Sequence, residues 1–94
     1  MIIAKVVGNI WATRKEEALV GRKLMIVQPA QLNGEANGEC FVAVDAVDSG
    51  IGEMVLVATG SSARKALGQE ESPIDASIVA IIDIHEVQRS GGRA

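Results

Sequence analysis

The sequence predicts an all-β chain that forms a small closed barrel of five strands, with one short helix between strands 4 and 5. Five segments are rich in β-branched and aliphatic residues, and pairs of asparagine, serine and glycine separate them. Only one segment has the residues of a helix, whereas a doubly wound α/β fold needs a helix after nearly every strand. With 94 residues the chain is expected to be one domain over residues 1–89, followed by a flexible tail at 90–94.

The first strand is expected over residues 2–13, which are apolar on both faces. Val6 falls on one face, and Val7 and Trp11 fall on the other. Gly8 interrupts the run and predicts a bulge or a sharp bend that helps the sheet to close. The pattern leaves open whether Trp11 packs in the core or at a contact between subunits. A polar loop follows to residue 21.

The second and third strands are predicted to form a hairpin over residues 23–28 and 39–47. The pairs at 33–34 and 37–38 are both Asn-Gly, which tolerates the positive φ of tight turns. Cys40 alternates with valines in the third strand, so we expect it to be buried, since a free cysteine usually behaves as a small hydrophobic residue. A lone cysteine cannot form a disulfide within the chain.

The fourth strand is expected over residues 53–59, after a turn at 49–52, and the fifth over 77–87. Between them, residues 63–67 predict a helix of at most two turns. Ser61 and Ser62 would cap its start through their hydroxyl groups, and a following glycine would end it.

The overall composition excludes several classes of protein. The net charge of −3 argues against a general nucleic-acid surface. The longest aliphatic run is far shorter than the ~20 residues that span a bilayer, and no secretory leader is recognisable at the start, so a cytoplasmic location is expected. Strands that are apolar on both sides leave an outer apolar surface with no helix to cover it. We expect neighbouring copies of the chain to cover this apolar surface.

One segment carries a family resemblance. Residues 44–64 read VDAVDSGIGEMVLVATGSSAR, preceded by KVVGNIWAT and KLMIVQP and followed by Pro73, Asp75 and AIID at 80–83. In this order the motifs resemble the bacterial microcompartment vertex proteins of the EutN/CcmL family. One departure is VDSG at residues 47–50, where many members have VGAG.

The resemblance implies an OB-like barrel that assembles as a homo-pentamer. It also implies a structural role, namely capping the five-fold corners of a polyhedral shell in the cytoplasm, beside hexameric shell proteins. Within that role it marks the residues of GSSAR as assembly or pore-proximal residues: Gly60, Ser61, Ser62, Ala63 and Arg64. Arg64 is expected to make an intersubunit salt bridge or carbonyl contact, because guanidinium offers several directional donors; a solvated arginine is the alternative.

No constellation for catalysis, a metal or a cofactor is recognisable. Adjacent strand residues point to opposite faces, so His85 and Glu86 cannot chelate together. Asp45, Asp48 and Glu53 lack calcium-loop spacing, and turn chemistry explains Asp48 and Ser49. We therefore expect a non-enzyme.

The alternative function is an OB-like module that binds nucleic acid or a small ligand. Basic pairs at residues 14–15, 22–23 and 64–65 favour this reading, and the scarcity of aromatic side chains for base stacking opposes it.

Overall fold

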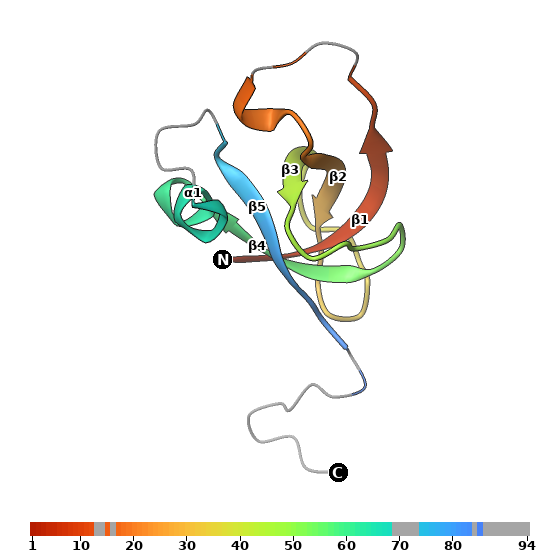
Figure 1. Cartoon of the computed structure of the whole chain (residues 1–94). Helices are drawn as coiled ribbons and strands as arrows, with labels where there is room; N and C mark the ends of the chain where they lie inside the picture. The colour runs from red at the N-terminus through yellow and green to blue at the C-terminus, as the bar shows by residue number, and fades with distance from the viewer. Residues whose placement is uncertain (13–14, 16, 69–73, 84, 86–94) are drawn as a thin grey trace.

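The computed structural model describes residues 1–12, 15, 17–68, 74–83 and 85. Its elements, in chain order, are β1 (Ile2–Ile10), the 3-10 helix η1 (Glu17–Leu19), β2 (Lys23–Pro29), β3 (Phe41–Asp45), β4 (Met54–Thr59), α1 (Ser61–Leu67) and β5 (Ala76–Ile81). Figure 1 shows the strands wrapped around one another with α1 at one end. All five predicted strands and the single α-helix are present.

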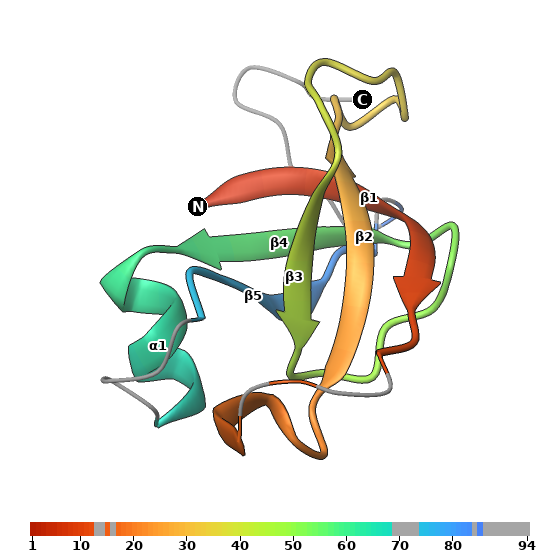
Figure 2. The same ribbon diagram turned by 90° about the horizontal axis from the view of Figure 1, so that it is seen from above.

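The strands close into a barrel in the order β1-β2-β3-β5-β4. Every neighbouring pair is antiparallel except β3 and β5, which run parallel because β4 carries the chain back to the starting end between them. Seen from above in Figure 2, β2 and β3 cross over β1 and β4, and α1 lies beside the end of β4. The predicted closed barrel, with a helix between strands 4 and 5, is confirmed.

A bulge at Gly8 bends β1. Val6 pairs with Val27 and Gly8 with Ile26, so Val7 is the extra residue on the β1 side. The bulge turns Val7 to the outside, where its side chain is 41% exposed. The predicted effect of Gly8 is confirmed.

The hairpin between β2 and β3 is also confirmed. Gly34 has φ +88, and the side-chain oxygen of Asn33 accepts a hydrogen bond from the amide of Glu35 at 2.9 Å. At Gly38 a Cβ would lie 2.9 Å from Pro29 Cγ, so only glycine fits this close approach.

The buried position predicted for Cys40 is wrong. Its side chain is exposed, because β3 begins at Phe41, two residues later than the predicted residue 39, and Cys40 lies before the strand. Other ends differ as well: β1 stops at Ile10, and β5 runs from Ala76 to Ile81 instead of reaching residue 87. Residues 84 and 86–94, which include Glu86 and the predicted tail, lie outside the described part of the chain.

Two clusters of small and medium aliphatic side chains fill the interior. The larger lies inside the barrel and consists of Ala4, Val6, Met25, Val27, Ala43, Val55, Val57, Ala76 and Ile78. The smaller lies under α1 and consists of Val44, Ala58, Ala63 and Ile74. The helix therefore closes one end of the barrel and is held there by apolar packing.

Candidate functional site: the start of α1, the Asp45 loop and the outer apolar side chains

Helix α1 begins directly after a glycine in a conformation that other residues rarely adopt. Gly60 has φ 62 and ψ −140, and its carbonyl accepts hydrogen bonds from the amides of Ala63 and Arg64 at 3.1 and 3.4 Å. Its own amide donates to the carbonyl of Asp75 at 2.8 Å, which ties the start of the helix to the segment entering β5.

The predicted serine caps are wrong. Gly60 occupies the N-cap position and no side chain caps the helix. Ser61 and Ser62 are the first two helical residues, so their hydroxyls lie one position too late to accept the orphan amides. Both side chains are exposed, whereas Gly68 ends the helix in the left-handed conformation, as expected.

Ala63 and Arg64 hold the first turn against the barrel. Ala63 is fully buried in the cluster under the helix. The half-buried Arg64 donates from Nη1 to the carbonyl oxygen of Ile74 at 3.1 Å. The structure thus brings the GSSAR residues together as a compact corner that presents two serines to solvent.

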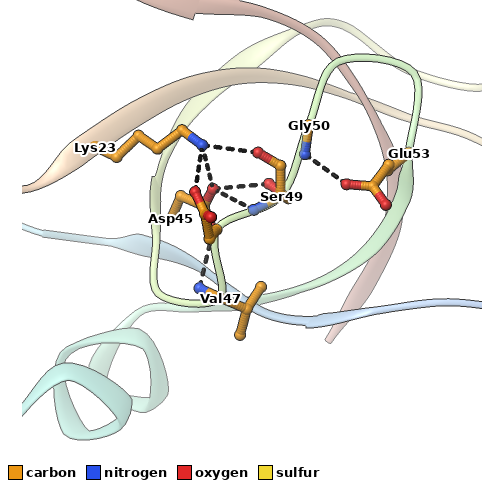
Figure 3. A network of polar contacts seen from close by, with 7 residues as sticks. Lys23, Asp45, Val47, Ser49, Gly50 and Glu53 are labelled. Carbon is orange, nitrogen blue, oxygen red and sulfur yellow. Dashed lines mark hydrogen bonds and ion pairs between the residues drawn. The ribbon is translucent and has the colours of Figure 1, made fainter.

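A second polar arrangement, shown in Figure 3, follows the end of β3. Asp45 is 8% exposed, and its Oδ1 accepts a hydrogen bond from the amide of Val47 at 3.0 Å. Its Oδ2 accepts from the amide and the hydroxyl of Ser49 at 2.7 and 2.9 Å. The Gly50 amide donates to Oε1 of Glu53 in the same loop.

Lys23 closes this loop from the neighbouring strand. Its Nζ donates to Oδ1 of Asp48 at 3.0 Å and to the carbonyl of Ser49 at 2.9 Å, and lies 3.5 Å from Oδ2 of Asp45. The hydrogen bond to Asp48, with the charges of Asp48 and Asp45, raises the pKa of Lys23 above its usual 10.5, although desolvation opposes the change.

Asp48, with its positive φ of 58, and Ser49 lie in the turn, as predicted, and Asp45 and Glu53 accept hydrogen bonds from amides of the same loop. Within the described residues no three side chains of the metal-binding types gather into a possible ion site. The sequence reasoning missed Lys23 and the burial of Ser49. The sequence did hold a signal for the burial of Ser49. Asp45 lies two residues before Val47 and four before Ser49, a spacing at which an aspartate can accept hydrogen bonds from backbone amides.

Three basic residues of the alternative nucleic-acid surface are engaged within the chain. Arg22 donates to the carbonyl of Leu67 at 3.3 Å, and Lys23 is held in the Asp45 loop. Arg64 is bound to Ile74. Arg14 of the first basic pair lies outside the described residues, as does Glu86, which was weighed above with His85 as a metal pair.

Large apolar side chains emerge on the outside of the barrel. Val7, Val42 and Ile81 are 41%, 44% and 42% exposed, which confirms the predicted outer apolar surface. The sequence left open whether Trp11 packs in the core or at a contact between subunits. Its side chain is 92% exposed, which excludes the core. Among the described residues, no helix combines the length and apolar character that crossing a membrane requires.

Comparisons with known proteins agree with this architecture. A family model described as "Ethanolamine utilisation protein EutN/carboxysome" matches residues 1–83. The bacterial microcompartment shell vertex protein GrpN of Rhodospirillum rubrum is 42% identical over 86 residues, which are 92% of this chain and 97% of that protein. The carboxysome shell vertex protein CcmL of Synechococcus elongatus is 43% identical over 88 residues, 94% of this chain and 89% of that protein.

Solved structures give the same result. A structure of the ethanolamine utilization protein EutN superposes with a TM-score of 0.86 at 41% identity, covering 98% of this chain and 93% of its own. The GrpN pentameric microcompartment shell protein of Rhodospirillum rubrum gives a TM-score of 0.79 at 41% identity, covering 88% of this chain and 94% of its own. By sequence and by fold, the chain belongs to the EutN/CcmL family.

Proposed function

We propose that this chain is a structural shell protein whose pentamer caps the vertices of a bacterial microcompartment in the cytoplasm. The observation that carries the proposal is the match of the whole barrel to relatives that are named shell vertex proteins, at above 40% identity. Solved relatives described as pentameric shell proteins support the ring of five. We propose no catalytic activity for it.

The exposed apolar side chains give this proposal a physical basis. A barrel of 94 residues has a small core, and burial between copies adds apolar area that one copy cannot supply. A contact between two different patches on identical chains closes into a ring when the rotation is right. Val42 and Ile81 are candidates for such burial.

The corner formed by Gly60, Ser61, Ser62, Ala63 and Arg64 is proposed as the assembly region near the ring axis. The exposed serine hydroxyls are free to face neighbouring copies, while Ala63 and Arg64 fix the backbone of the turn. In this view Arg64 acts within its own chain, by binding the Ile74 carbonyl. Hexameric shell proteins are the proposed partners around the rim of the ring.

Light scattering coupled to size exclusion tests the ring directly. Five copies of the 9.8 kDa chain predict a particle of about 49 kDa at micromolar concentration. A stable single subunit at that concentration contradicts the proposal. Electron microscopy after co-expression with a hexameric shell protein tests the vertex role: closed shells are expected with this chain, and open sheets or tubes without it.

Replacing Ser61 and Ser62 by alanine tests the assembly role of the corner. The double variant is expected to keep the barrel, because neither hydroxyl caps the helix, and to alter ring assembly or shell closure. Unchanged assembly removes the two serines from the proposal and leaves the ring itself intact.

A further inference from the structure

We propose that Trp11 of one copy docks into a surface hollow at the start of β1 and α1 of the next copy. The inference rests on the proposed ring, because it names a contact that joins neighbouring copies. It specifies the two patches that meet.

Trp11 is the projecting half of this contact. It directly follows the last residue of β1 and, at 92%, is the most exposed large hydrophobic side chain among the described residues. An aromatic side chain of this size buries roughly 150 to 250 Å² when covered, and tryptophan is enriched among residues that dominate interface energies. Left in water, this indole contributes nothing to the barrel's own core.

The receiving half is a shallow hollow of about 620 Å³ on the outside of the barrel. Its walls include Ile2, Phe41, Val42 and Gly60, so most of them are apolar or carry no side chain. Nothing lies within 4 Å of the position that a Cβ on Gly60 would take, which leaves this wall open. The volume accommodates an indole ring.

The edge of β3 also opens onto this hollow. Within the described residues, β3 pairs with β5 only at Val44 and Asp45, whereas on its other side it pairs with β2 along its whole length. Phe41 and Val42 therefore have no β5 partner beside the hollow. A strand edge that lacks a neighbour is a typical place for another chain to pack.

The two halves lie at opposite ends of the same strand. Ile2, the first residue of β1, lines the hollow, and Ile10, the last residue, precedes Trp11. Figure 2 shows β1 running across the molecule between these ends, with α1 on the side of its start. A contact from one end of a protomer to the other end of the next is heterologous, which is the kind that generates rings.

The charges of the two patches are opposite. The surface around Trp11 includes the exposed Lys15 and also Arg22. The hollow includes the exposed carboxylate of Asp75, which makes no side-chain bond to another described residue. The indole N–H is a donor, so Asp75 supplies both an acceptor for it and a partner for Lys15.

Photo-crosslinking maps the contact. The full chain carrying p-benzoylphenylalanine at position 11 is mixed in ¹⁴N and ¹⁵N forms, assembled and irradiated, and crosslinked peptides between the two isotopic forms are identified by mass spectrometry. We expect crosslinks to peptides that contain Ile2, Phe41 and Val42, or Asp75. Crosslinks instead to the hollow that Glu53, Met54 and Ile81 line, or a ring without crosslinks between copies, overturn the inference.

Substitution gives an independent measurement. Trp11→Ala is expected to weaken subunit association at least about 30-fold, the loss that defines an interface hot spot, with an unchanged circular dichroism spectrum. Ile51→Ala, which truncates a side chain 63% exposed and outside both patches, is the matched control and leaves association unchanged. Lys15→Asp and Asp75→Lys each weaken association, and together they restore it.

The outcomes separate this contact from the proposed function. A ring that survives Trp11→Ala, or one that weakens equally with Ile51→Ala, overturns the Trp11 contact and leaves the vertex role standing. A wild-type protein that remains a single subunit overturns both.

Discussion

Asp45 and Ser49 are joined by two hydrogen bonds to one oxygen: Oδ2 of the carboxylate accepts from the serine amide at 2.7 Å and from its hydroxyl at 2.9 Å. Both residues are buried, at 8% and 1% exposure. A third bond comes from the amide of Val47 to Oδ1. A carboxylate is acceptor-only, and here local donors satisfy both of its oxygens. Among the side chains that hold the turn after β3, Asp45 therefore makes the buried hydrogen bonds.

Asp45→Asn is expected to lower the free energy of unfolding by about 1 to 3 kcal/mol. An amide presents one oxygen and one NH2 group, so whichever way it is turned a donor of the loop meets another donor. Urea unfolding followed by circular dichroism, at a fixed protomer concentration, measures the loss.

Asp48→Asn is the matched control. The Asp48 side chain is 94% exposed and, among the described residues, forms a hydrogen bond and ion pair with Lys23 alone, and an exposed pair of this kind contributes less than about 1 kcal/mol. Asparagine also tolerates the positive φ of 58 at this position. If the two variants lose equal stability, the buried hydrogen bonds of Asp45 do not fix the turn.

Gly60→Ala is expected to lower the free energy of unfolding by about 1 to 3 kcal/mol, because φ 62 with ψ −140 is strained for any residue with a Cβ. Nothing lies within 4 Å of the new methyl group, so the loss is conformational rather than steric. Urea unfolding at a fixed protomer concentration measures the loss, because the stability of an oligomer depends on concentration.

Ser61→Ala provides the contrast in the same turn. With no capping hydrogen bond to remove, the substitution changes the free energy of unfolding by less than about 0.5 kcal/mol. A loss near 1 kcal/mol, the usual cost of deleting an N-cap, would show that the Ser61 hydroxyl caps the helix after all.

The elements that local chemistry determines could be predicted from the sequence. Aliphatic periodicity indicated every strand, Gly8 marked the position of the bulge, and the turn at Gly34 follows from the positive φ that glycine tolerates. The errors at Cys40 and at Ser61 are small offsets: β3 begins two residues later than predicted, and the N-cap lies at Gly60, one residue before Ser61. Such offsets decide burial and capping, and tertiary packing sets them rather than propensity.

The candidate site was predictable only where its parts are close in sequence. Turn chemistry around Asp48 was expected, and the carbonyl contact of Arg64 exists, although it is formed within the chain. The contribution of Lys23 was not foreseen, because it depends on the pairing of Lys23 with Asp45 across two strands. The outward position of Trp11 depends on where β1 ends, which the apolar pattern does not mark.

Cys40→Ser is expected to change the free energy of unfolding by less than about 0.5 kcal/mol, because the thiol is exposed and outside β3. Ala43→Ser, which introduces the same side chain three residues later, places a hydroxyl at a position only 1% exposed inside the barrel. An unpaired hydroxyl there costs about 1 to 3 kcal/mol. Thermal unfolding of the two variants side by side distinguishes them, and a large loss for Cys40→Ser contradicts the exposed position.

The contacts of Lys23 predict a pH dependence at the alkaline end. Asp48, through its hydrogen bond and charge, and Asp45 raise the pKa of the folded lysine above 10.5, so the folded state binds the proton more tightly than the unfolded state does. The stabilisation is fully present below pH 10.5 and is lost as the pH rises through the higher folded pKa.

Unfolding by urea between about pH 9 and pH 12 measures this loss. Lys23→Met removes it and flattens the alkaline decline, while Lys23→Arg keeps its charge throughout and delays the decline. The comparison isolates Lys23, because every other titrating group is the same in the three proteins. An identical alkaline profile for wild type and Lys23→Met contradicts the assignment of the raised pKa to this contact.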